Sequence, residues 1–247
     1  MDRIRSRTLA SATLLGAAIA LLMLLPVRGQ SSFDACDAAI DNLRTAIVEC
    51  GVINTGWACY GSVEAEALPV KYRFHRPADQ RPLEILESIN TVNEQGVVVM
   101  TLAPEGELDP VTAILFGQAT LDATGGNAYI LDTSGGDLCA QTPPGMIVRT
   151  ESGRRGSIVL NGATIELGST ALVTMASTTM TVVNLDGNVS VVVIGDSADL
   201  PVGYAVEVDG EGRLGSPQPT DLIQSPVYAF LAKDPAGLPA VRNLNAT

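Results

Sequence analysis

The feature that most constrains this chain is a series of short apolar runs between residues 145 and 209. The runs are rich in Val, Ile, Leu and Thr, and glycine-containing turns separate them. Such runs at regular spacing are typical of a sandwich, a barrel or a short β-solenoid. We therefore predict an all-β module over residues 145–210. Its predicted strands are 146–150, 156–160, 163–167, 170–175, 180–185, 188–194 and 204–208, with the strongest hairpin signals at Asn161-Gly162 and Asp186-Gly187.

Residues 31–140 combine a helical pattern with further strand patterns. Apolar residues at spacings of three and four predict a helix from Asp34 to Glu49. The segments after it are predicted as strands at 63–74 (with a break at Pro69), 96–102, 112–121 and 127–132, and as a short helix at 82–90. We therefore predict a mainly β fold, in which a disulfide-linked α+β module precedes the all-β module.

The two ends of the chain differ from its body. Residues 1–30 combine Arg3, Arg5 and Arg7 with an apolar run up to Pro26, which predicts a signal peptide, or alternatively an uncleaved membrane anchor. Residues 211–247 are rich in proline, which predicts a C-terminal arm. We expect one short helix or extended segment at 221–233 and a loose end over the last ten residues.

The four cysteines of the chain predict two disulfide bonds. An even number of cysteines in an exported chain favours disulfides over a metal site, and no Cys-x-x-Cys pair is present. Cys36 and Cys50 would lie about 20 Å apart along the predicted helix, whereas a disulfide requires Cα atoms within about 7 Å. Two pairings remain: Cys50–Cys59 with Cys36–Cys139, which we favour, or Cys36–Cys59 with Cys50–Cys139.

Charge and composition exclude several classes of function. The net charge is −12, and the leader holds basic residues, so the remaining chain is more acidic still. Nucleic-acid binding requires clustered Lys and Arg, and we expect none. The single histidine, His75, leaves most zinc sites without ligands. We accordingly expect no cofactor and no resident metal.

Part of the β module resembles a known family. The stretches Gly145–Gly153, Ile158–Ser169 and Met180–Val192 are similar to the FecR-type domain, with Asn161-Gly162 and Gly187 at its glycine positions. The resemblance implies a non-catalytic extracytoplasmic β domain, and founding members of the family relay an outer signal to a membrane partner. The chain lacks their cytoplasmic N-terminal region and any clear internal transmembrane helix.

The first module resembles a module of exported bacterial proteins that has no established activity. The shared features are Cys36 and Cys50 around a helix, the tripeptide Cys59-Tyr60-Gly61, and a strand ending in Ile114-Leu115-Phe116-Gly117. This resemblance implies a location in the cell envelope or at the cell surface.

Two segments are similar to catalytic motifs. Val191–Ser197 resembles the nucleophile block of SGNH hydrolases, which would make Ser197 the nucleophile, but no histidine follows it to serve as the base. Asp132-Thr133-Ser134 and Asp196-Ser197-Ala198 approach the aspartic-protease signature, but both lack its glycine. Ordinary strands and turns explain both patterns better.

Three other groups of residues invite a functional interpretation. His75 lies in the basic segment Arg73–Pro77, where an anion contact competes with a plain surface loop. Trp57 and Tyr60 suit either a sugar platform or packing over a disulfide, and we favour packing. The acidic run of Glu105, Glu107 and Asp109 lacks the ligand pattern of a calcium loop, so we predict a solvated turn.

Taken together, these patterns predict an exported, non-enzymatic protein of the bacterial envelope, located in the periplasm, at the cell surface or outside the cell. Its role would be binding or scaffolding, with an unknown protein or envelope component as partner, and it would touch a membrane only through an uncleaved leader. The alternatives are envelope signal sensing through the FecR-like module and an SGNH-like esterase. No ligand can be named from the residues, and the disulfide pairing stays open.

Overall fold

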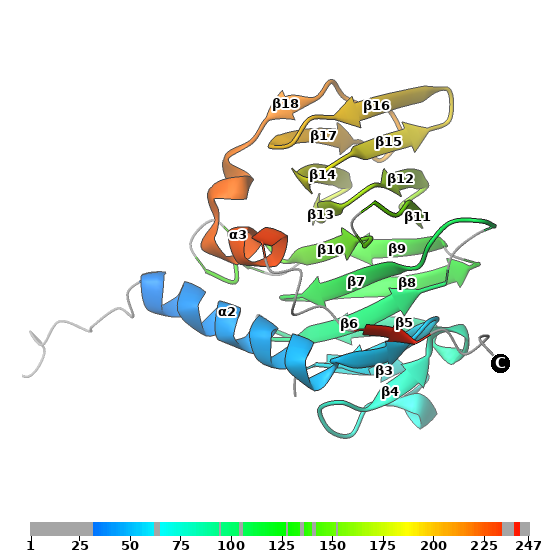
Figure 1. The fold of residues 1–247 in the computed structure, drawn as a ribbon, viewed down its shortest axis with the longest axis vertical. Coiled ribbons are helices and arrows are strands. Elements are labelled where there is room, and N and C mark those ends of the chain that lie inside the picture. Colours follow the sequence, from blue (N-terminus) through cyan, green and yellow to red (C-terminus); the bar gives the residue numbers. More distant parts are fainter. Residues whose placement is uncertain are drawn as a thin grey trace, which may run out of the picture. The chain divides into compact units, whose positions relative to one another are not determined.

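Two large β-sheets, a two-stranded sheet and two α-helices are the main elements of the described residues from Ser32 onward in the computed structural model (Figure 1). The structure describes residues 32–61, 65–93, 95–103, 106–126, 128–133, 136–139, 142–151, 153–233 and 240–242. The predicted signal peptide at residues 1–30 lies outside these ranges. The mainly β prediction is confirmed, and a helix precedes the sheets as expected.

The larger sheet has nine strands in the order β18-β17-β14-β13-β10-β7-β6-β2-β4. Four of its central strands are buried along nearly their whole length, which indicates that both faces of this sheet are covered. The strands are β2 (Trp57–Tyr60), β4 (Gln80–Pro82), β6 (Val97–Leu102), β7 (Val111–Phe116), β10 (Gly145–Arg149), β13 (Thr170–Ala176), β14 (Thr179–Asp186), β17 (Tyr204–Val208) and β18 (Gln218–Pro219).

The smaller sheet has eight strands in the order β16-β15-β12-β11-β9-β8-β5-β3. Buried residues alternate with more exposed ones in most of these strands, as expected for a sheet with one solvated face. The strands are β3 (Ala65–Leu68), β5 (Ser88–Thr91), β8 (Ala119–Gly125), β9 (Ala128–Asp132), β11 (Gly156–Leu160), β12 (Ala163–Leu167), β15 (Val189–Val193) and β16 (Asp196–Leu200).

The chain passes repeatedly from one sheet to the other, usually after two strands. β6 and β7 pair in the larger sheet, β8 and β9 in the smaller one, and strands on both sides of the predicted module boundary belong to both sheets. The division into modules at 140 and 145 stays a prediction. The structure shows that strand pairing crosses it, because β10 pairs with β7 and β9 pairs with β11.

One strand prediction and one hairpin prediction are wrong for the same reason. The single strand predicted at 112–121 is two strands, β7 and β8, which belong to different sheets and meet at Gly117. A Cβ on Gly117 would lie 2.6 Å from the Cβ of Pro144. Asp186-Gly187 was expected to join a hairpin, but it carries the chain from β14 in one sheet to β15 in the other. A glycine in the sequence indicates a turn with a positive φ, here 70° at Gly187. It does not indicate which sheet the next strand joins.

Asn161-Gly162 forms the hairpin that its sequence predicts. The pair joins β11 to β12 with φ angles of 50° and 81°. The Asn161 side chain also extends the sheet: its Oδ1 accepts a hydrogen bond from the Leu131 N–H (2.7 Å), and its Nδ2 donates to the Leu131 carbonyl (3.0 Å). The side chain therefore continues the parallel pairing of β9 with β11.

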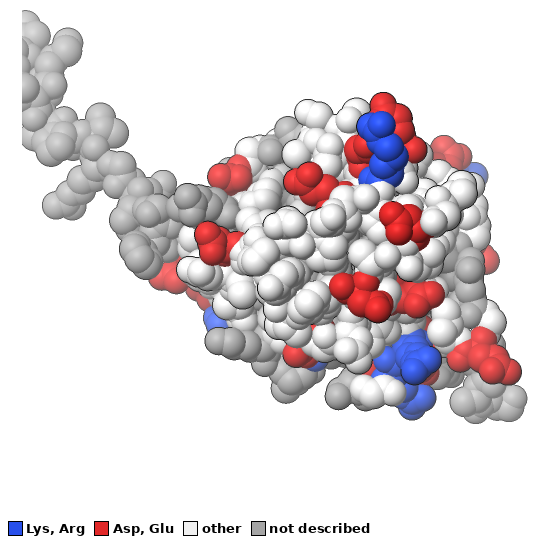
Figure 2. Space-filling model, turned by 90° about the horizontal axis from the view of Figure 1, so that it is seen from above, with Lys and Arg blue, Asp and Glu red and all other residues white. Residues whose placement is uncertain are grey.

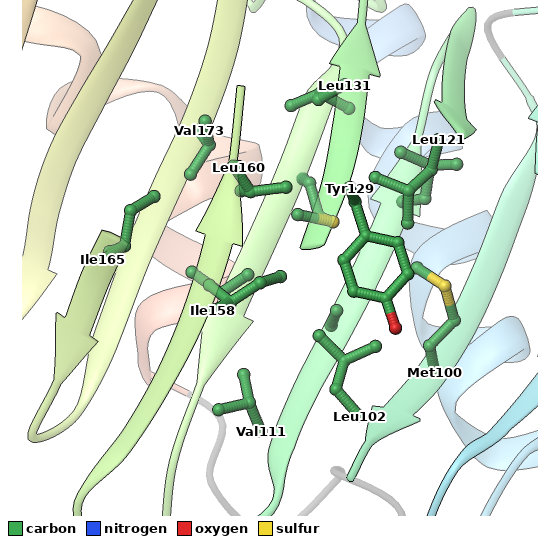
Figure 3. Close-up of a cluster of buried hydrophobic side chains, with 14 of the residues drawn as sticks. Met100, Leu102, Val111, Leu121, Tyr129, Leu131, Ile158, Leu160, Ile165 and Val173 are labelled. Carbon is green, nitrogen blue, oxygen red and sulfur yellow. The ribbon is translucent and has the colours of Figure 1, made fainter. Parts of the chain in front are cut away.

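The main apolar core lies between the two sheets. Inward-facing side chains of both sheets form it, among them Met100, Leu121 and Ile158 (Figure 3). Tyr60 also faces this core, where its ring stacks on Phe74 at a centroid distance of 5.2 Å. Burial of this continuous apolar layer is the main driving force that holds the sheets together.

A second core lies on the outer face of the nine-stranded sheet, beneath the helices α2 (Ser32–Glu49) and α3 (Pro226–Lys233). Ile114, Phe116 and Ile147 project from the sheet, and Leu43 and Tyr228 project from the helices. The predicted helix at 34–49 is confirmed, and the helical option for 221–233 is confirmed by α3 and the short 3₁₀ helix η3 (Asp221–Gln224).

The remaining differences from the sequence-based expectation concern short elements. The helix predicted at 82–90 is a single 3₁₀ turn, η2 (Leu83–Ile85), between β4 and β5. The strand predicted at 63–74 is β3 followed by the 3₁₀ turn η1 (Val70–Tyr72), and β16 was not predicted. In the segment expected to be loose, β19 (Ala240–Arg242) pairs in parallel with β1 (Val52–Asn54).

Candidate functional site

No described helix covers the outer face of the eight-stranded sheet, and we call this surface the open face. Its side chains are the ones that alternate with the buried residues of each strand. Both described helices pack instead against the nine-stranded sheet (Figure 1). The open face is therefore the natural candidate for contact with another molecule.

Strand register places polar side chains of the open face in rows across neighbouring strands. In one row Ser157, Glu166, Ser190 and Asp199 lie side by side on β11, β12, β15 and β16. The Ser190 hydroxyl donates a hydrogen bond to the Asp199 carboxylate. A second row, on β3, β5, β8 and β9, contains Glu66, Asn90, Thr120 and Asp132. Each row thus contains two carboxylates.

The open face is negatively charged. Its outward charged residues are all acidic, and the eight strands contain neither Lys nor Arg. These carboxylates are Glu66, Asp122, Asp132, Glu166 and Asp199. At the end of the molecule that carries β16 to β18, acidic side chains also outnumber basic ones (Figure 2). An unbalanced negative potential of this kind attracts cationic surfaces and repels anionic ones.

A shallow hollow of about 380 Å³ lies over part of this face. Hydroxyl, amide and carboxylate groups of Ser157, Thr164, Glu166, Asn188 and Ser190 line it, and Arg155 stands at its rim. The neighbouring Arg154 forms an ion pair with Asp109 (Nη1 to Oδ1, 3.1 Å). The hollow therefore offers both hydrogen-bond donors and hydrogen-bond acceptors on a mostly acidic surface.

The structure separates the residues of the esterase hypothesis. Ser197 is exposed on β16, at one edge of the eight-stranded sheet. His75 lies in the segment that leads from β3 to β4, and these are the edge strands at the opposite end of the two sheets. Seven inter-strand spacings of roughly 4.8 Å each separate β16 from β3, so the only histidine is roughly 30 Å from Ser197. It cannot take a proton from that hydroxyl.

The two aspartates of the protease hypothesis are also far apart. Asp132 ends β9 and Asp196 begins β16, with three strands between them in the sheet. Two carboxylates share a proton only at about 3 Å, so this pair cannot act as a dyad. Ser134 lies outside the described residues.

Trp57 and Tyr60 do not form one platform, because their side chains lie on opposite faces of the nine-stranded sheet. Trp57 packs against the cluster that contains Cys50 and Cys59, as the packing interpretation predicts. Tyr60 packs in the core between the sheets, against Phe74.

The loop around His75 is organised by a carboxylate. Asp79 accepts a hydrogen bond from the His75 N–H (2.9 Å) and lies near the guanidinium groups of Arg76 and Arg81. Burial disfavours the charged form of Asp79, but the N–H groups of His75 and Arg76 and these two guanidinium groups outweigh it. The pKa of Asp79 is therefore lowered. His75 itself is exposed.

The acidic run is a turn, as expected, where the structure describes it. Asp109 pairs with Arg154, and its backbone N–H donates to the Arg155 carbonyl (2.8 Å). Glu107 is exposed, and Glu105 lies outside the described residues. Within the described ranges no group of three His, Cys, Asp or Glu side chains could hold a metal ion.

The cysteines form the favoured pairing. Cys36–Cys139 joins α2 to the segment before β10, and Cys50–Cys59 joins the end of α2 to β2, with Cα–Cα distances of 5.1 and 5.9 Å. α3 is fixed to the same segment, because the Tyr228 hydroxyl donates to the Pro143 carbonyl (2.7 Å) and Ser225 bonds to Thr142. Covalent and polar contacts therefore hold both helices on the nine-stranded sheet.

The carboxylates of the open face were missed by motif analysis. Glu166 stands between the core residues Ile165 and Leu167, so period-two alternation marks it as outward-facing. Its neighbours Ser157 and Ser190 come from other strands and depend on register. The alternation within one strand therefore identifies a single outward-facing residue, but it cannot identify which residues of other strands lie beside it.

Comparison with known proteins does not identify a family for this chain. No family model matches the chain, and no curated protein matches it. A solved structure of a candidate anti-sigma factor from Parabacteroides distasonis is similar at a TM-score of 0.37 and 14% identity, over 55% of this chain and 60% of that one. The match thus spans less than two thirds of that protein. In the described part of the chain, no helix is long and apolar enough to cross a membrane.

Proposed function

We propose that this chain is a non-catalytic exported protein of the bacterial envelope with a binding or scaffolding role. The observation that carries the proposal is the asymmetry of the sandwich. Two disulfide bonds and two helices close the outer side of one sheet, whereas the other sheet presents an acidic, hydroxyl-rich face. Structural disulfides form in oxidising compartments, which supports an exported location.

The chemistry of the open face selects the kind of partner. The open face has outward carboxylates, and its strands contain neither Lys nor Arg. Such a surface suits a basic protein or envelope surface, held by charge-assisted hydrogen bonds to the carboxylates and by neutral hydrogen bonds to the Ser and Thr hydroxyls. Such contacts are sensitive to salt because they are partly solvated.

Charge reversal on the open face tests this function. The full-length protein is expressed in a bacterial host with an export pathway, and its sedimentation with washed envelope fractions is measured at low and high salt. Glu166→Lys with Asp199→Lys should abolish salt-sensitive sedimentation. The matched control is Asp37→Lys with Asp41→Lys on exposed positions of α2, which should leave it unchanged. Sedimentation that is absent from the wild type, or equal in both variants, would overturn the proposal.

The same preparation separates binding from envelope signal sensing. Intact mass under non-reducing conditions reports cleavage and disulfides together. A product that starts near Gln30 with both disulfides formed supports the binding role. A full-length product retained in the membrane would mean that the leader is an anchor, and signal sensing would then replace scaffolding as the better hypothesis.

A further inference from the structure

A cleft of about 590 Å³ lies beyond the end of β6 and is distinct from the hollow on the open face. Both sheets contribute to its walls: Trp57 comes from the nine-stranded sheet, Tyr129 comes from the eight-stranded one, and Leu83 and Leu86 come from the turn that joins them. The volume is that of a small-molecule site, and the lining is mainly apolar and aromatic, as such sites usually are.

Tyr129 is the unusual residue of this cleft. Its side chain is 7% exposed, and within the described part of the chain its hydroxyl forms no hydrogen bond. Burial alone raises the pKa of this phenol. The hydroxyl points toward Leu102, the last residue of β6 (Figure 3), and the next residue, Ala103, lines the cleft. The side chain is mostly buried, but its oxygen is not among the fully buried atoms, so the hydroxyl can form a hydrogen bond to a ligand atom in the cleft.

The rim of the cleft is open at two glycine turns. Gly56 and Gly125 line the cleft with φ angles of 78° and 107°, and a Cβ on either would meet no atom within 4 Å. These turns need glycine for their backbone conformation and leave free space beside it. A ligand can therefore approach the Tyr129 side of the cleft without displacing a side chain from either turn.

The charge at the rim is negative. Glu84 lines the cleft with an exposed carboxylate. The nearby Arg81 does not balance it, because its guanidinium donates to the carbonyls of Tyr72 and Gln80 (3.1 and 2.7 Å) and faces Asp79. A positive group on a ligand is therefore favoured at this position.

We propose that this cleft binds a small aromatic amine, with the ring inside the cleft that Trp57 and Tyr129 both line, a polar atom on the Tyr129 hydroxyl and the protonated amine near Glu84. The proposal goes beyond the binding role of the open face and does not depend on it, since the cleft and the hollow share no lining residue. It concerns a small molecule, whereas the open face concerns a macromolecular surface.

Three simple probes test the proposal on the wild-type protein. Tyramine carries a ring, a hydroxyl and an amine, phenethylamine lacks the hydroxyl, and 4-ethylphenol lacks the amine. Trp57 is the only tryptophan and lines the cleft, so its emission, excited where the probes do not absorb, reports binding directly. Tyramine should bind most tightly, by roughly fivefold or more over phenethylamine, because one hydrogen bond is lost. Unchanged Trp57 emission with all three probes would overturn the proposal.

Two conservative variants assign the contacts. Tyr129→Phe should weaken tyramine roughly fivefold to tenfold and leave phenethylamine unchanged. Glu84→Gln should weaken both amines by roughly twofold to fivefold and leave 4-ethylphenol unchanged. Tyr204→Phe and Glu207→Gln on β17 are the matched controls, outside the cleft. Equal weakening of all three probes by Tyr129→Phe would instead show a packing defect and contradict the assignment.

Discussion

The two sheets of this protein have similar strand numbers and share one core, but they differ in their outer faces. β6 and β7 of the nine-stranded sheet are buried at every residue, whereas β11 and β12 of the eight-stranded sheet alternate between core and surface. The first pattern requires an outer layer, which α2 and α3 supply. The second requires none and leaves polar groups available. The comparison shows that the burial pattern along each strand indicates whether its sheet has a covering layer on the outer face.

The covering layer is held covalently, so its removal should give the largest effect. Cys36→Ser with Cys139→Ser opens a link of sequence separation 103, and Cys50→Ser with Cys59→Ser opens one of separation 9. In the chain-entropy description the longer link contributes about 5 kcal/mol and the shorter about 2.5 kcal/mol. Urea denaturation should therefore show the greater loss of unfolding free energy for the first pair. Equal losses would mean that α2 is held mainly by packing.

The next prediction compares one isoleucine from each outer face. Ile147 projects from β10 beneath the helices and is 2% exposed, whereas Ile130 projects from β9 on the open face and is 48% exposed. Ile147→Ala should lower the free energy of unfolding by about 2–5 kcal/mol, because it leaves a cavity. Ile130→Ala should lower it by less than about 1 kcal/mol. Similar values in denaturant titrations would show that the open face is covered in solution.

The extent to which the sequence predicts this asymmetry differs between the two sheets. The strand at 97–102 is apolar except for Thr101, and the predicted strands 156–160 and 163–167 have the observed bounds, so strand positions follow from local pattern. The sheet to which a strand belongs does not follow from local pattern. Gly117 and Gly187 both adopt a positive φ in a turn, and at each of them the chain passes from one sheet to the other. That choice is decided by packing between distant strands, which local propensity does not contain.

The candidate sites were less predictable than the fold. The length of a helix excluded the Cys36–Cys50 pairing and left two options, of which the structure forms the favoured one. The row of Ser157, Glu166, Ser190 and Asp199 depends on the register of four strands, and the cleft around Tyr129 depends on an approach of both sheets. Neither leaves a contiguous motif in the chain.

A third prediction concerns the junction in the middle of the eight-stranded sheet, where β9 and β11 run in parallel. Asn161→Asp keeps an acceptor for the Leu131 N–H and removes the donor to the Leu131 carbonyl. The loss of this half-buried bond should cost about 1–2 kcal/mol. Hydrogen exchange should become faster at the β9 amides that neighbour Leu131, with the nine-stranded sheet unchanged. Unaltered protection of β9 would show that backbone pairing alone fixes the junction.

The smallest effect is expected where the chain crosses from β3 in one sheet to β4 in the other. The lowered pKa of Asp79 means that the folded state binds its proton less tightly than the unfolded state does. The carboxylate therefore contributes stability above its unfolded pKa, and this contribution is lost as the pH falls through the lowered folded pKa. Asp79→Asn should reduce stability at neutral pH by no more than about 1 kcal/mol, because its ion pairs are partly solvated. The difference in unfolding free energy between wild type and variant should shrink as urea titrations are repeated toward pH 3.

Asp209, whose pKa is also lowered, pairs with Arg213 beyond β17, at the far end of the sheets. Asp209→Asn is therefore the control, and it should leave hydrogen exchange in the β3–β4 crossing as it is in the wild type. A gap for Asp79→Asn that stays constant down to pH 3 would show that the side chain holds the crossing by shape and neutral hydrogen bonds, and the polar link between the two sheets would then not depend on charge.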